Sequence, residues 1–154
     1  MPNSLGPDVI DALIRVANDE VDPSVIVLDG MGVTDNPATY LMVGVDDPTS
    51  SGVPRSFEEK QDHATVGISG IRDVAGVVFC SVASWRGDGN QKMARDEARA
   101  VIDALLAGCR ATPALAVTGL LWVSAGTEFD LKQWQHAEGC TALAMFQVAY
   151  SGQV

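Results

Sequence analysis

Two stretches of the chain carry apolar residues at the spacing of an α-helix. The first begins near Pro7, a residue that suits an opening helical turn, and stops at Pro23, because proline disfavours a helical residue before it. The second covers residues 90–110 and stops at Pro113. One face of each stretch is apolar and the other is polar, so we predict two amphipathic helices. Their apolar faces consist of Ile10, Leu13, Ile14 and Ala17, and of Ala94, Ala98, Val101, Ile102, Leu105 and Cys109.

Seven further runs are short and are either apolar or alternating, a pattern that is typical of strands. With the helices they give the order helix, strand, strand, loop, strand, strand, helix, strand, strand, strand. This order predicts the α+β class, with a single, largely antiparallel or mixed β-sheet and two α-helices packed on one face. Trp122 lies within one of the runs, and we expect it in the core. The runs are residues 25–28, 40–45, 64–69, 74–85, 115–125, 128–137 and 140–151.

A polar stretch at residues 46–62 interrupts this pattern. It opens with Asp46-Asp47-Pro48 and is rich in serine, proline, glutamate and lysine. It is too long for a hairpin turn, and loops of such length are usually functional or mobile. We therefore predict one domain over residues 1–154, with a long polar loop at about 46–62.

The length and the net charge limit the classes of function that we expect. A chain of 154 residues corresponds to one domain with a core of its own. Its net charge of −10 repels phosphates, so we do not expect a module that reads nucleic-acid sequence. A negatively charged protein surface would still suit DNA that must slide past it without sticking. Solubility alone is the simpler explanation of the charge.

The cysteines and the remaining motifs indicate no bound group. Cys80, Cys109 and Cys140 stand far apart in apolar runs, so we expect free, buried thiols. No ligand pair has zinc spacing, and the acidic pairs at 46–47 and 58–59 fit a solvated loop, so we predict no metal and no cofactor. There is no long apolar run and no signal-peptide pattern at the start, so we expect a soluble protein made in the cytoplasm, with no membrane partner.

Candidate catalytic residues are scarce. His63 follows Asp62, so His63 could act as a general base that Asp62 orients. However, the sequence has no turn motif that would present a nucleophile, and Ser69 lacks the required spacing. We therefore expect no enzyme, with a small hydrolase using His63 as a distant alternative. The Gly87-Asp88-Gly89 turn lacks the later glycine or lysine of a phosphate-binding loop, so we expect Asp88 or Asn90 to cap the following helix.

Two tryptophans are candidates for contacts between molecules. Trp85 lies at a strand end and Trp134 lies in a polar segment, so both are expected to be half-exposed. Such tryptophans often anchor contacts between subunits, but they can also cover a sheet edge. Both interpretations stay open at this point.

Taken in order, several segments resemble the tail terminator proteins of bacteriophages with long, non-contractile tails, especially phages of actinobacteria. The similarity covers nearly the whole chain and lies in the order and spacing of the segments, without an invariant motif. The segments are the helix at residues 9–18, Val27-Leu28-Asp29-Gly30, Val43-Gly44-Val45-Asp46-Asp47, residues 76–83, Ala94-Arg95, Ala104-Leu105-Leu106, Thr112-Pro113-Ala114-Leu115, Gly139-Cys140-Thr141 and residues 146–150.

The resemblance implies a structural virion protein. Such proteins form a ring, usually a hexamer, on the tail tube; the ring stops tube polymerisation and then receives the head-side connector or stopper. Genomic DNA passes through the channel without sequence-specific binding. Sheet edges, half-exposed tryptophans and the long loop would supply the contacts. The candidate interface residues are Trp85, Trp134, Asp46, Asp47, Arg55, Phe57, Glu58 and Glu59.

A related role also fits the same pattern. The chain could be a head–tail connector, a stopper or another minor tail protein with a similar α+β fold. A small-molecule binding module would need a sizeable apolar pocket between the sheet and the helices.

Overall fold

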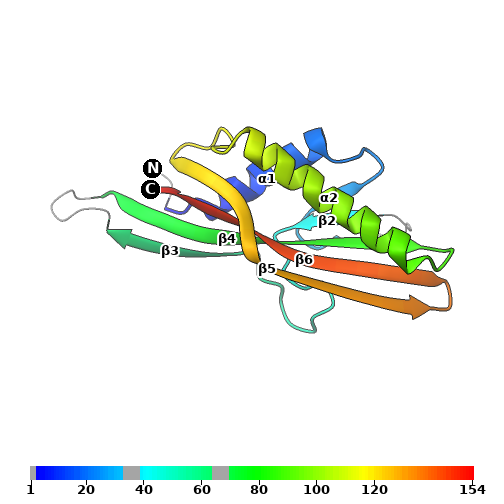
Figure 1. Cartoon of the computed structure of the whole chain (residues 1–154). Coiled ribbons are helices and arrows are strands. Elements are labelled where there is room, and N and C mark those ends of the chain that lie inside the picture. Colours follow the sequence, from blue (N-terminus) through cyan, green and yellow to red (C-terminus); the bar gives the residue numbers. More distant parts are fainter. Residues whose placement is uncertain (1–2, 33–38, 64–69) are drawn as a thin grey trace.

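Over the residues that it describes, the computed structural model of the chain has one β-sheet covered on one face by two helices (Figure 1). It describes residues 3–32, 39–63 and 70–154. The predicted α+β class is confirmed. The elements are α1 (Gly6–Glu20), β1 (Ile26–Asp29), β2 (Tyr40–Val43), β3 (Phe57–His63), β4 (Arg72–Arg86), α2 (Gln91–Ala111), β5 (Leu120–His136) and β6 (Gly139–Gln153).

The sheet is mixed, with one parallel pair. Its strand order is β1-β2-β4-β6-β5, and β3 also pairs with β4. The β1–β2 pair is parallel, and every other pair is antiparallel. β2 pairs with residues 80–83 of β4, whereas β3 pairs with residues 72–78. Two strands therefore share one edge of β4, and residues 44–56 form the connection between them.

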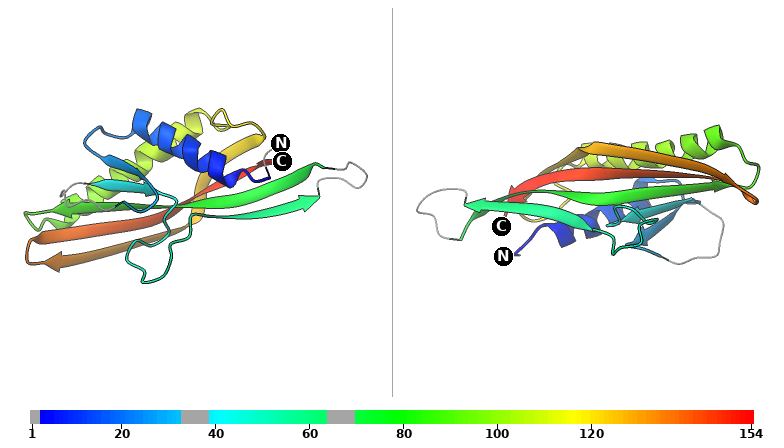
Figure 2. Two further views of the ribbon diagram at one scale, coloured as in Figure 1. Left: turned by 180° about the vertical axis from the view of Figure 1, so that it is seen from behind. Right: turned by 90° about the horizontal axis from the view of Figure 1, so that it is seen from below.

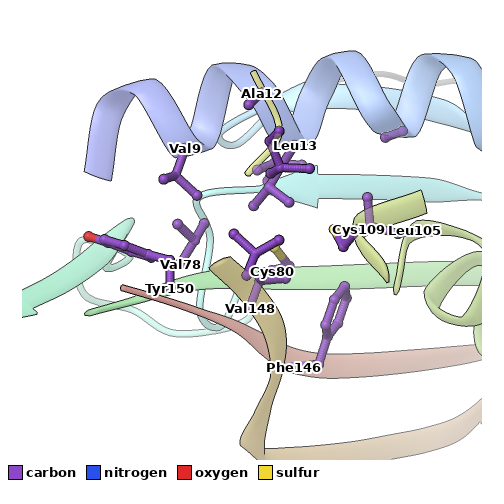
Figure 3. Packing of buried hydrophobic residues seen from close by; sticks show 14 of the residues in the cluster. Val9, Ala12, Leu13, Val78, Cys80, Leu105, Cys109, Phe146, Val148 and Tyr150 are labelled. Carbon is purple, nitrogen blue, oxygen red and sulfur yellow. The ribbon is translucent and has the colours of Figure 1, made fainter. Parts of the chain in front are cut away.

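Both helices pack on the same face of the sheet and enclose the core (Figures 2 and 3). Alternate residues of β4 and β6 point towards them, as the pairs Val78–Val148 and Cys80–Phe146 show. Leu13 of α1 packs in the same buried cluster. Side chains return to the same face every 3.6 residues in a helix and every 2 residues in a strand. This repeat alone brings the apolar residues together in the core.

The two helices begin in different ways. At α2, the Asn90 side chain accepts a hydrogen bond from the Met93 amide over 3.1 Å, so Asn90 is the cap. Asp88 is instead held by Arg86, and it accepts the Asn90 amide. At α1, Leu5 occupies the capping position and provides no side-chain hydrogen bond, so another part of the chain must satisfy the first amides.

Replacing Asn90 with alanine is expected to lower the free energy of unfolding by about 1 kcal/mol, because an N-cap acceptor is lost. Urea unfolding followed by circular dichroism measures the change. Lys92→Ala is the matched control on the same helix: it removes only an exposed ion pair with Asp96 and should cost about 0.5 kcal/mol or less. Equal effects from the two variants would contradict the assigned cap.

Several sequence-based boundaries differ from the structure. The polar loop predicted at 46–62 ends earlier, because β3 starts at Phe57 and its polar residues form an edge strand. The strand expected from residue 115 starts at Leu120, since Leu115 and Ala116 both have positive φ angles and the chain turns there. The two runs at 115–125 and 128–137 join into one bent strand, β5. The strand predicted at 64–69 lies outside the described residues.

The prediction of free, buried cysteines is confirmed: Cys80, Cys109 and Cys140 are buried and unpaired with one another. Burial raises the pKa of the Cys80 thiol to about 12 and that of Cys109 to about 11. A thiol must ionise to react, so both should be inert in the native state. We expect a disulfide reagent at pH 8 to modify none of the three in the folded protein and all three in guanidinium. Fast modification of the folded chain would contradict this packing.

Candidate interaction surface

The described residues contain no group of three or more histidine, cysteine, aspartate or glutamate side chains that could hold a metal ion. His63 is the last residue of β3, and both its side chain and Ser69 lie outside the part of the structure that is described. His136 is exposed at the end of β5, and its Nε2 lies 3.1 Å from the Thr141 hydroxyl.

Glu59 is the most highly bonded of the candidate interface residues. One of its carboxylate oxygens accepts the amides of Leu5 and Gly6, both over 3.1 Å, and the Tyr150 hydroxyl over 2.8 Å. The Ser4 hydroxyl also donates to it, over 3.2 Å. Burial raises the pKa of Glu59, but hydrogen bonds outweigh it, so the pKa lies below its ordinary value; these bonds come from Gln61, Tyr150, Ser4 and the Leu5 amide. Glu59 thus caps α1 from a neighbouring strand, rather than facing outward from a loop.

The connection between β2 and β3 is held by ion pairs. Arg55 Nε lies 2.8 Å from Asp46, and its Nη1 lies 2.6 Å from Glu58. Burial raises the pKa of Asp46, but the Arg55 and Asp47 hydrogen bonds prevail and lower it. The Arg55 guanidinium also lies 4.4 Å from the centre of the Phe79 ring, a cation–π contact. The connection therefore lies against the helix-free face of the sheet.

The same connection meets the bend of β5. Lys132 of β5 forms an ion pair with Asp47 over 3.1 Å. Between the connection and the bend is an open hollow of about 650 Å³. Four carboxylates line it, together with Arg55, Phe79 and other side chains; they belong to Asp46, Asp47, Glu128 and Asp130. The four carboxylates outnumber the two cations that pair with them, Arg55 and Lys132, so this part of the surface has a net negative charge.

The two tryptophans singled out in the sequence lie in one row of the sheet. Trp85 of β4 and Trp134 of β5 both pair with Thr141 of β6, from opposite sides. Trp134 is 39% exposed, and Trp85 is of intermediate burial. Phe57, by contrast, packs against the core beside Gly6. The pairing thus brings Trp85 and Trp134 onto one helix-free face, while Phe57 and Glu59 belong to the interior side.

Sequence analysis missed the exposure of β5. Leu121, Trp122 and Phe129 are 61%, 45% and 63% exposed, and with Trp134 they make β5 the strand with the most large apolar side chains at the surface. The expected core position of Trp122 is wrong, because β5 is an edge strand with register shifts that turn Trp122 away from the helices. The high polarity of residues 124–138 around Phe129 and Trp134 was a signal of this exposure in the sequence.

The turn before α2 also lacks the features of a ligand site. Arg86 binds Asp88 through Nε and Nη2, at 3.1 and 2.8 Å, and also bonds Glu97 of α2. The bonds from Arg86 lower the pKa of Asp88 to about 2, so a negative charge stays at the helix start. An anion is disfavoured there, in agreement with capping as the role of this turn.

The fold defines a single-sheet α+β domain, and that class has a counterpart among solved structures. No protein-family model and no curated protein matches the sequence. A chain of the virion of the native gene transfer agent (GTA) particle has a similar fold, with a TM-score of 0.51 and 12% sequence identity. The similarity covers 99% of this chain and 100% of that chain. None of the described helices is both long and apolar enough to cross a membrane.

Proposed function

We propose that this chain is a structural protein of a phage-like virion and acts as a tail terminator. It would form a ring, usually of six copies, at the head-proximal end of the tail tube. The ring would stop tube polymerisation and present the surface to which the head-side connector or stopper binds. It would carry out no catalysis.

The observation that carries this proposal is the end-to-end likeness of fold to a chain of a virion particle. The similarity of fold covers 99% of this chain and 100% of that chain. The resemblance of the sequence to phage tail terminators agrees with this proposal.

The surface chemistry is compatible with a DNA channel. The net charge of −10 per copy and the four carboxylates at the hollow would give a ring a negative wall. Such a wall repels phosphates, so DNA could pass without binding.

The oligomeric state of the purified full-length chain tests the proposal. Light scattering combined with particle imaging should reveal rings, alone or once tail tube protein is added. A ring should then appear at one end of each tube. A strict monomer at every concentration, with and without tube protein, would contradict the proposal.

Deletion of the gene distinguishes the terminator role from a connector or stopper role, because the two deletions should give different particles. Without a terminator, tubes lose length control, so overlong or headless tails are expected. Without a head-side stopper, tails should have normal length and remain free. Normal free tails would therefore replace the terminator role with the connector role.

A further inference from the structure

The outer strand β5 has one regular half and one irregular half. Residues 129–136 pair one to one with residues 139–146 of β6, whereas register shifts occur between Leu120 and Trp122 and between Ala125 and Phe129. Bulges blunt a sheet edge, and a regular edge with unpaired main-chain groups recruits another strand. The regular half also carries Phe129 and Trp134, both exposed. It is therefore the part of β5 suited to strand addition.

The opposite border of the sheet offers a matching strand. Among the described residues β3 pairs with β4 alone, so its outer edge is open. The view from below shows β3 and β5 at opposite borders of the sheet (Figure 2, right). β5 runs parallel to β4, since both are antiparallel to β6, whereas β3 runs the other way. A second copy set beside the first therefore presents its β3 antiparallel to β5, the alternation already present in the sheet.

We infer that residues 129–136 of β5 dock on β3 of a second copy and extend the sheet from one copy to the next. This inference rests on the proposed ring and names the contact that would build it. The partner is a second copy because both complementary edges belong to this chain. A contact between two different edges is heterologous, and it closes into a ring when the rotation between copies allows.

The exposed charges of the two strands favour one register. Asp130 and Lys132 point to the helix-free face, since they pair with Met145 and Leu143 in the same rows as Ser81 and Ala83 of β4. Glu58 and Lys60 share that face, since they pair with Val77 and Ala75 of β4. The favoured antiparallel register is the one that sets Asp130 against Lys60 of the second copy and Lys132 against Glu58 of the second copy. Opposite charges directly across two strands stabilise the pair.

Neighbouring registers are less favourable. A slide by two residues sets Lys132 against Lys60 or Asp130 against Glu58, which places like charges opposite each other. A slide by one residue moves the charges to opposite faces of the sheet. In the favoured register each pair joins an existing ion pair, because Lys132 already binds Asp47 and Glu58 already binds Arg55. The result is a network of charges across the contact.

The same register gives a plausible ring geometry. Within one copy, Lys132 lies in the same row as Ala83 of β4, and Glu58 lies in the same row as Val77 of β4. When Lys132 stands opposite Glu58 of the next copy, residue 83 of one β4 is therefore level with residue 77 of the next. Successive copies are then staggered by about six residues, or ~20 Å along the strands. Each copy adds four strands, β3, β4, β6 and β5, about 19 Å wide at ~4.8 Å per strand. The strands then tilt from the ring axis by about 45°, at the upper end of the range in closed β-barrels.

Cysteine cross-linking tests the contact in the full-length chain. The double variant Lys60→Cys with Asp130→Cys should form disulfides between copies under mild oxidation and give a ladder up to the ring size on a non-reducing gel. The three native cysteines are buried and should not contribute. The control is Lys92→Cys with Asp130→Cys, because Lys92 is an exposed residue of α2, away from β3. Neither the control nor the single variants should give a ladder.

A charge exchange provides the second measurement. Asp130→Lys or Lys60→Asp alone should remove the ring fraction at a concentration where the natural chain is assembled, and the two together should restore it. Rings by light scattering without the ladder or the restoration would overturn this contact and leave the terminator proposal standing. A strict monomer would overturn both.

Discussion

Replacing Glu59 with alanine is expected to lower the free energy of unfolding by about 3 kcal/mol. One carboxylate oxygen accepts the amides of Leu5 and Gly6 and the hydroxyls of Ser4 and Tyr150. Bonds to a charged acceptor contribute about 1.5–3 kcal/mol each and are not additive, and their loss leaves donors in the interior without partners. Urea unfolding of the purified variant measures the change.

The adjacent residue provides the control. Glu58→Ala removes an exposed carboxylate whose ion pair with Arg55 is also exposed, so it should cost about 1 kcal/mol or less. Glu59→Gln keeps an oxygen acceptor but loses the charge, and it should fall between the two. If Glu58→Ala and Glu59→Ala were equally destabilising, the assignment of Glu59 as the cap of α1 would be wrong.

The pH dependence of stability gives an independent readout of the same cluster. The pKa of Glu59 is lower in the folded chain than its ordinary value of 4.5. Its stabilising contribution is therefore complete above about pH 4.5 and is lost as the pH falls through the lower, folded pKa. The difference in unfolding free energy between the natural chain and Glu59→Gln should shrink below pH 4.5. A difference that stays constant down to pH 3 would contradict the charged cap.

Replacing Gly76 with alanine is expected to cost about 3 kcal/mol, the upper end of the usual range for overpacking. A Cβ atom at Gly76 would lie 2.5 Å from the Glu58 carbonyl oxygen and 2.6 Å from the Tyr150 ring. Neither neighbour can retreat easily, since one is main chain in a paired strand and the other is a buried ring bonded to Glu59. Below α1, Tyr150 fills the space that a side chain on Gly76 would need (Figure 3).

Gly52→Ala is the matched control for Gly76→Ala. A Cβ atom there would meet only the Ser50 hydroxyl, at 3.7 Å, so Gly52→Ala should be neutral or slightly stabilising. Thermal unfolding of the two variants under one condition makes the comparison. A Gly76→Ala variant as stable as Gly52→Ala would show that β3, β4 and Tyr150 are not packed as described.

The interaction surface was predicted only in part. Trp85 was singled out because it lies near a strand end, and Trp134 because it lies in a polar segment; both features are visible in the sequence. Their position in one row with Thr141 was not, because it depends on two separate strand registers. Phe129 was missed because its exposure follows from the bend of β5, where the register shifts between Ala125 and Phe129.

The two helices and the α+β class follow from local patterns in the sequence. Apolar spacing along α1 and α2 is a local property, and so are the prolines shortly after the two helices and the polar turn that offered Asp88 or Asn90 as the cap of α2. The long central strand β4 was equally clear, because apolar and β-branched residues continue over both of its faces.

The polar strand β3 and the cap of α1 depend on contacts that form only in the folded chain. Residues 57–62 are mostly charged or polar, and β3 forms there because β4 offers an open edge to pair with. Glu59 caps α1 from more than fifty positions away in the chain, so no pattern near Leu5 reveals it. Edge strands and remote caps gain their stability from a partner, and a partner distant in sequence leaves no local trace.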